Sequence, residues 1–149
     1  MDFSEIDTPF TVIDYERLVS NLERHLLRTQ QQGIASRPHA KTHKIPEMAK
    51  LQLEYGARGI TLATIGEAEV FVEAGIDDIF LAYPLWLTPR KAARLQALAP
   101  RARVGMGVDS VAGIQQAAKT LGTTTIEFMI EVDSGHHRSG IDPHQVVPL

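Results

Sequence analysis

The sequence predicts an α/β fold, a partial (β/α)8 barrel of the TIM type with about five of its βα units. Short β-rich apolar runs alternate with helical runs along the whole chain, at a spacing of roughly 20 to 30 residues. The phosphate-binding GxGxxG loop of an open doubly wound sheet is absent, because Gly105-Met106-Gly107 lacks the third glycine. A complete barrel needs eight units and typically ~250 residues, so we expect the first part of one.

The first elements form three strand and helix pairs. Each expected strand is a short run of apolar or β-branched residues. Pro46 suits the first turn of a helix, and Gly56 and Gly75 are helix stop signals. In chain order we expect strand Phe10–Ile13, helix Tyr15–Gln32, strand Ile34–Ala40, helix Pro46–Gly56, strand Gly59–Ala63 and helix Gly66–Ala74.

The same alternation continues in the second half. Thr88 before Pro89 is a strong helix start, because threonine caps the first turn and proline fits its first position. Gly122 marks the end of the last helix. We expect strand Asp78–Tyr83, helix Thr88–Leu98, strand Arg103–Val108, helix Ser110–Leu121 and strand Thr124–Asp133.

Composition excludes several classes of protein. Of the 149 residues, 44% are apolar and 22% charged, which are ordinary values for a globular protein. No uninterrupted apolar run approaches the length of a membrane span. The net charge of −3 argues against nonspecific nucleic-acid binding. Without cysteine there is no disulfide and no thiolate zinc site. The start, MDFSEIDTPF, has acids where a secretory signal has bases, so we expect a cytoplasmic location.

One segment, SRPHAKTHK at Ser36–Lys44, concentrates positive charge: two lysines, two histidines and an arginine in nine residues. If it continues as a strand, alternation sends every second residue from Arg37 to His43 to one face. Cationic neighbours and partial burial lower a lysine's pKa and favour the neutral amine of Schiff-base chemistry, which makes Lys41 the candidate. The alternative is a solvated loop.

The histidines also suggest a metal site. His39 and His43 form HxxxH, and a second histidine pair, His136-His137, follows the last expected strand. Four residues of strand span ~13 Å, so His39 and His43 would share an ion only on a helix. Pro38 and Pro46 oppose a helix there, and we expect no metal site within this chain.

Three motifs together resemble a known family. They are TPFTVID at Thr8–Asp14, RPHAKTHK at Arg37–Lys44 and EVDSGHHRSG at Glu131–Gly140. Their order and spacing resemble the fold-type III pyridoxal-phosphate enzymes, specifically the D-threonine aldolase and D-serine dehydratase group related to the alanine racemase N-terminal domain. Gly56–Ile60 and Asp77–Pro84 also look like this group.

The resemblance implies an alanine racemase N-terminal-like barrel that binds pyridoxal 5'-phosphate. It implies that Lys41, rather than Lys44, forms the internal aldimine, and that Arg138 approaches the phenolate oxygen of the cofactor ring. The cofactor then acts as an electron sink for bond breaking at the α-carbon of a D-β-hydroxy amino acid. An aldolase breaks Cα–Cβ, a dehydratase removes a proton and hydroxide, and a racemase moves the proton alone.

The resemblance also implies what lies elsewhere. Residues 1–149 correspond to the N-terminal part of the cofactor-binding barrel, with the C-terminal barrel strands and β domain absent. In such relatives those parts provide the phosphate-binding loops and hold a divalent metal, and the Phe10–Ile13 strand pairs with the β domain. We expect a small D-amino acid as substrate and a homodimer. The alternatives are a non-catalytic pyridoxal-phosphate-binding homeostasis protein, a racemase-like protein, and an inactive truncated chain.

The other conspicuous residues receive structural interpretations. Glu67 and Glu69 lie two apart at a helix start, where they favour the positive helix end. Trp86 is expected to be a packing residue. Asp133 either orients Arg138 or ends its strand. The two histidines before Arg138 either line the substrate side or are incidental, and the second interpretation is preferred.

Overall fold

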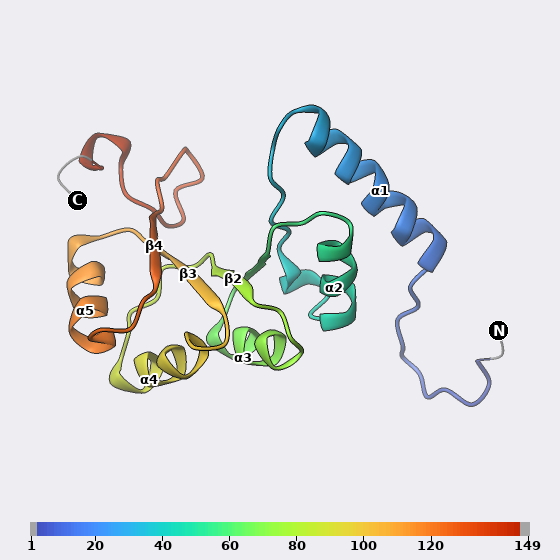
Figure 1. Cartoon of the computed structure of the whole chain (residues 1–149), viewed down its shortest axis with the longest axis horizontal. Coiled ribbons are helices and arrows are strands. Elements are labelled where there is room, and N and C mark those ends of the chain that lie inside the picture. Colours follow the sequence, from blue (N-terminus) through green and yellow to red (C-terminus); the bar gives the residue numbers. More distant parts are fainter. Residues whose placement is uncertain (1–2, 147–149) are drawn as a thin grey trace. The chain divides into compact units, whose positions relative to one another are not determined.

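The computed structural model describes residues 3–146, and the chain divides into two compact units, Met1–Ala35 and Ser36–Leu149 (Figure 1). In the first unit, helix α1 covers Tyr15–Gln31, within one residue of the prediction. It begins there because the carboxylate of Asp14 accepts a hydrogen bond from the Arg17 backbone N–H at 3.0 Å. The helix has no buried residue.

The predicted strand at Phe10–Ile13 is wrong. These residues form no strand, because no described segment pairs with their backbone. Their apolar side chains are exposed, Val12 to 60%. A β-rich sequence becomes a strand only when a neighbouring strand completes its hydrogen bonds.

The second unit contains a parallel four-stranded sheet. Its strands lie in the order of the sequence, β1-β2-β3-β4, and every neighbouring pair is parallel. An open doubly wound sheet reverses its strand order at a switch point, whereas a barrel does not. The order confirms the prediction of a partial barrel. The strands are β1 (Ile60–Leu62), β2 (Asp78–Leu81), β3 (Arg103–Val108) and β4 (Glu127–Ile130).

Three helices connect consecutive strands, as predicted, and lie along one side of the sheet (Figure 1). Each begins at a hydroxyl cap: Thr64, Thr88 and Ser110 accept hydrogen bonds from the backbone N–H groups of their first turns. These helices are α3 (Ile65–Glu73), α4 (Pro89–Leu98) and α5 (Val111–Leu121), and a further helix, α2 (Pro46–Glu54), precedes β1.

The hydrophobic core lies between the sheet and these helices. Alternate residues of each strand point toward the helices. Among them, Leu62, Leu81 and Met106 are completely buried. Phe71 of α3 and Leu95 of α4 fill the space opposite. Burial of each such side chain contributes about 1.5–3 kcal/mol, so this layer holds the sheet and helices together.

The opposite face of the sheet corresponds to the inside of the barrel. Paired residues of parallel strands point to the same side, which places Thr61, Phe80 and Gly105 in one row of this face. A Cβ at Gly105 would lie 2.9 Å from Phe80 Cδ2. Glycine there leaves the space beside β3 that the Phe80 ring occupies.

Two expected strands differ from the prediction. The strand predicted at Thr124–Asp133 is shorter, Glu127–Ile130, and all of its residues are exposed, Met129 to 53%. Ile34–Ala40 makes only isolated parallel bridges with the segment around β1, Ser36 to Ala57 and His39 to Thr61. From the first bridge to the second, the basic segment advances by three residues and the segment around β1 advances by four, so a regular ladder cannot form.

Candidate functional site

The basic segment follows β1 as far as His39 and then turns. The Thr61 N–H donates to the Pro38 carbonyl at 2.8 Å, which holds the segment beside β1. A 3-10 helix, Ala40–Thr42, follows, and Lys41 lies exposed in its centre. The expected alternation of basic side chains along a continuous strand is therefore wrong beyond His39.

His39 serves the turn that carries Lys41. Its Nδ1 accepts a hydrogen bond from the Lys41 backbone N–H at 3.3 Å. Burial lowers the pKa of His39, and the charge of Lys41 lowers it further. Glu67 and the Thr61 backbone offset part of this shift. The imidazole is thus neutral at pH 7, with its proton on Nε2.

His43 is also neutral. Burial is the main cause of its lowered pKa, and its Nδ1 accepts from the Ile45 N–H at 3.0 Å. The two histidines beside Lys41 therefore add no positive charge at neutral pH, which corrects the expectation of cationic neighbours. The cations of the turn are the two lysines.

Lys44 is paired with a carboxylate. Its Nζ lies 3.2 Å from Oε1 of Glu67, and its backbone has a left-handed φ of 53°. Burial raises the pKa of Glu67, but hydrogen bonds from the Ala63 N–H, Lys44 and the Thr64 N–H bring it below its usual value. Glu67 completes the capping box of α3 with Thr64, so its interpretation as a helix-start residue is confirmed.

A cavity of about 230 Å³ opens at the carboxyl ends of β1 and β2. Ala63 and Ala82, which directly follow the two strands, form part of its wall. Lys41 and Arg138 both line it, so the structure brings the two candidate residues together. No carboxylate is among its described lining residues, which are His39, Lys41, Ala63, Ala82, Tyr83 and Arg138.

Arg138 is carried on a closed loop, Glu131–Ile141, that we call the Arg138 loop. The Asp133 N–H donates to the Ile141 carbonyl at 2.9 Å, and the Ile141 N–H donates to the Glu131 carbonyl at 2.8 Å. Gly140 has φ 101°, and a Cβ there would lie 2.6 Å from the Asp133 nitrogen. Only glycine fits this position.

Asp133 organises the tip of the Arg138 loop. Its carboxylate accepts from the backbone N–H groups of His137 and Gly135, at 3.0 and 2.9 Å, and its Oδ2 lies 2.8 Å from His137 Nδ1. The bonds from His137 and Gly135 lower the pKa of Asp133 to about 2. Asp133 thus holds the residue before Arg138, while Ser139, the residue after it, donates to Glu131 at 2.6 Å.

Two cavity residues had no assigned role from the sequence. Tyr83 ends the predicted strand at Asp78–Tyr83, and the carboxyl end of a barrel strand is a signal for a site residue. For His39 the sequence indicates only a metal ligand or a charged neighbour of Lys41. Trp86, expected to pack inside, is 56% exposed, so that prediction is wrong.

Residues 3–146 contain no cluster of three or more histidine, aspartate or glutamate side chains able to share a metal ion. Within the same residues, no helix has the length and apolar character to cross a membrane.

The family model of the alanine racemase N-terminal domain matches residues 13–149. The chain belongs to this family. Among curated relatives, a D-threonine aldolase of an Arthrobacter species is 36% identical over 97% of this chain and 38% of its own length. D-threo-3-hydroxyaspartate dehydratase of Delftia is 40% identical over 91% of this chain and 36% of its own. An uncharacterized protein of Mycobacterium bovis is 48% identical over 59% of this chain and 53% of its own.

The solved structures that superpose on this chain include the same two kinds of enzyme. The D-threonine aldolase of Filomicrobium marinum superposes with a TM-score of 0.87 at 32% identity, over 92% of this chain and 37% of that one. A variant of D-threo-3-hydroxyaspartate dehydratase gives 0.83 at 37% identity, over 97% of this chain and 37% of that one. The resemblance inferred from the three motifs is confirmed, and the chain spans well under half the length of these enzymes.

Proposed function

We propose that this chain forms the lysine-bearing part of a pyridoxal-phosphate-dependent lyase acting on D-β-hydroxy amino acids. The observation that carries the proposal is the convergence of Lys41 and Arg138, far apart in sequence, on one cavity. The alanine racemase N-terminal family implies pyridoxal phosphate as the cofactor, and relatives that match most of this chain include D-threonine aldolase and D-serine dehydratase. Residues 1–149 would then be the N-terminal part of the cofactor-binding barrel.

The cavity fits this cofactor chemically. An amine and a guanidinium line it without an opposing carboxylate, which suits an anionic ligand that carries an aldehyde. Ala63 and Ala82 leave the wall at the strand ends free of bulky side chains, as a flat ring requires. The residues that would hold the group are Lys41, through its amine, and Arg138, through its guanidinium.

When bound, pyridoxal phosphate supplies an electron sink for negative charge that develops at the α-carbon of an amino acid. Lys41 would hold the group through Nζ, which as a neutral amine can also accept and return a proton in the cavity. Arg138 presents fixed N–H donors and a permanent positive charge to an acceptor atom in the cavity. His39, whose Nδ1 accepts a hydrogen bond from the Lys41 backbone N–H, orients the turn.

The test is to mix the chain with pyridoxal phosphate, reduce with borohydride, and locate the pyridoxyl group by peptide mass spectrometry. We expect the label on Lys41. In Lys41→Ala the pyridoxyl label fixed at the cavity should fall by more than about 100-fold, because no other amine is among the described lining residues. Lys50→Ala, which removes an exposed lysine of α2, is the matched control and should label normally. Label spread over surface lysines would contradict the proposal.

Substrate assays then separate the reaction types. D-threonine cleavage would release glycine and acetaldehyde, whereas D-serine dehydration would release pyruvate and ammonia. Label on Lys41 with neither set of products would favour the alternative of a binding protein without lyase activity.

We further propose that the protein is a homodimer in the cytoplasm. The dimer is tested by sedimentation velocity across a range of protein concentrations, and a monomer at all of them would refute it.

A further inference from the structure

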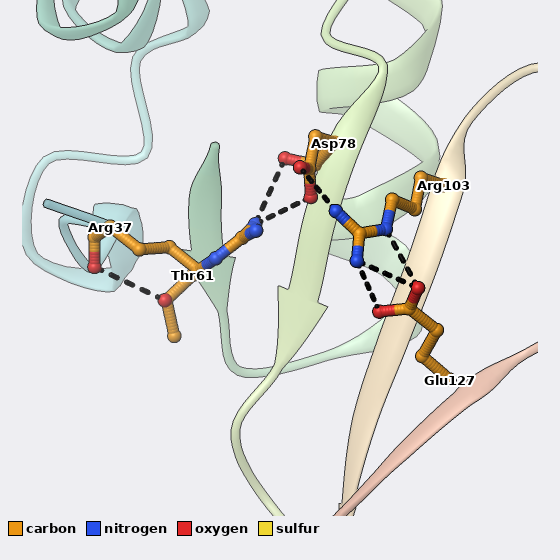
Figure 2. Close-up of polar contacts among 5 residues, drawn as sticks. All are labelled: Arg37, Thr61, Asp78, Arg103 and Glu127. Atoms are coloured by element: carbon orange, nitrogen blue, oxygen red, sulfur yellow. Dashed lines mark hydrogen bonds and ion pairs between the residues drawn. The ribbon is translucent and has the colours of Figure 1, made fainter. Parts of the chain in front are cut away.

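Arg37 reaches across β1 to the next strand. Its Nη1 donates to Oδ1 of Asp78 at 2.7 Å and contacts the Asp78 carbonyl at 3.4 Å, with the two side chains 23% and 18% exposed (Figure 2). The guanidinium passes over Gly59, where a Cβ would lie 2.9 Å from Arg37 Cζ and 2.7 Å from the Asp78 carbonyl oxygen. The path across the strand exists because residue 59 has no side chain.

The contact continues across the sheet as a row of alternating charges. Arg103 on β3 lies 3.5 Å from Asp78 Oδ2 and makes two hydrogen bonds of 2.8 Å to Glu127 on β4 (Figure 2). We call Arg37, Asp78, Arg103 and Glu127 the charge ladder. Because Asp78, Arg103 and Glu127 are the first residues of their strands, the ladder lies at the opposite end of the sheet from the cavity.

We infer that Arg37 is a positioning residue for Lys41, an inference that rests on the proposed function. The segment from Ser36 to His39 forms isolated bridges and no regular ladder. Its backbone accepts hydrogen bonds from the Arg58 and Thr61 N–H groups, both at 2.8 Å. The Arg37 side chain adds a fixed attachment to β2 that the irregular backbone pairing lacks.

This attachment fixes the position along β1 at which the basic segment turns away from the strand. The Arg37 carbonyl accepts from Thr61 Oγ1 at 3.3 Å, so backbone and side chain of the same residue are fixed to two strands (Figure 2). Two residues later His39 pairs with Thr61, and its imidazole accepts from the Lys41 N–H. A shift of the segment by one residue would turn His39, the last residue that pairs with β1, to the opposite face, and the 3-10 turn that His39 caps would carry Lys41 away with it.

The experiment compares three variants of the chain. Arg37→Ala removes the attachment. Gly59→Ala blocks its path while leaving both charges in the sequence, and its methyl group would also press on the Asp78 carbonyl oxygen, 2.7 Å away. Arg37→Lys is the rescue variant, because the contact to Asp78 uses a single nitrogen that an ammonium can replace. Arg101→Ala, which breaks the exposed pair with Glu73, is the matched control.

Two readouts are taken on each variant. The first is the borohydride-fixed label on Lys41 relative to that on Lys44, which we expect to fall about 10-fold in Arg37→Ala and Gly59→Ala and to recover partly in Arg37→Lys. The second needs no cofactor: amide exchange at Arg58 and Thr61 should accelerate about 10-fold, with Met106 of β3 unchanged. Arg101→Ala should alter neither.

Unchanged label and exchange in Arg37→Ala would overturn the inference. Faster exchange with an unchanged label ratio would also overturn it, since Arg37 would then stabilise the segment without positioning the lysine. If the unmodified chain takes no label on Lys41, the proposed function fails, and the exchange rates decide whether Arg37 fixes the segment. A melting curve for each variant shows whether that variant is folded. If Gly59→Ala does not fold, the comparison of Arg37→Ala with Arg37→Lys decides the inference.

Discussion

The sheet face that corresponds to the inside of the barrel carries paired charges at one end and, among the described residues, unpaired cations at the other. At the amino end, the charge ladder alternates in sign, and each arginine lies against a carboxylate. At the carboxyl end, Lys41 and Arg138 line a cavity that contains no described carboxylate. Charges that serve stability are paired, because a half-buried ion without a partner is costly. Cations left without acids around a cavity indicate a place for an anionic ligand.

The largest effect is expected from breaking the ladder at its centre. Asp78→Ala removes the carboxylate between Arg37 and Arg103 and leaves two cations side by side at the sheet end. We expect the free energy of unfolding to fall by about 2 kcal/mol in urea denaturation. Glu73→Ala, which removes the acid of an exposed pair, should cost less than about 0.5 kcal/mol. Equal effects in the two variants would contradict the comparison.

Arg138→Ala tests the opposite end. It should weaken binding of pyridoxal phosphate about 10-fold, equivalent to ~1.4 kcal/mol, because a charged donor is lost from the cavity. The free energy of unfolding should change by less than about 0.5 kcal/mol, since Arg138 is exposed. Spectroscopic titration and urea denaturation measure the two quantities. His136→Ala, an exposed neighbour in the same loop that does not line the cavity, should bind the cofactor normally.

Lys44 sharpens the comparison, because it is a paired cation near the cavity end. Both Lys44→Ala and Lys44→Gly lose the contact with Glu67, but only glycine adopts the φ of 53° without strain. We expect the glycine variant to be more stable than the alanine variant by about 1 kcal/mol in urea denaturation. The reverse order would show that residue 44 does not adopt the left-handed conformation in solution.

The smallest effect concerns the order of the Arg138 loop at low pH. Asp133 has a pKa of about 2, below its ordinary value of 3.8, so the unfolded loop binds a proton more readily than the folded one. The contribution of Asp133 is present above about pH 4 and is lost as the pH falls toward 2. Amide exchange at Gly135 and His137 should accelerate in that window. In Asp133→Asn, which has no proton to gain, the acceleration should be absent.

Much of the fold could be predicted because its signals are local. A threonine before a proline at Thr88-Pro89 and a glycine at Gly122 fix helix ends whatever surrounds them. The strand at Phe10–Ile13 failed because its state depends on a partner backbone, about which a run of apolar residues carries no information. Ile34–Ala40 failed for a related reason, since its pairing with β1 is interrupted by a change of register.

The site was predictable only where a motif specified a residue. The basic segment and the motif resemblance both indicate Lys41, the resemblance alone indicates Arg138, and the structure places both on one cavity. The neutral state of His39 could not be read from its basic neighbours, because it results from burial. The ladder partners of Arg37 also could not be read, because Asp78 lies 41 residues away.

Gly59 has a consequence for how sequences of this family can vary. A methyl group at this position would meet the Arg37 guanidinium and would also lie 2.7 Å from the Asp78 carbonyl oxygen, which belongs to the backbone of β2. A shorter side chain at residue 37 would remove only the first of these contacts. Glycine at 59 is therefore expected to persist among related sequences even where the ion pair between Arg37 and Asp78 is replaced.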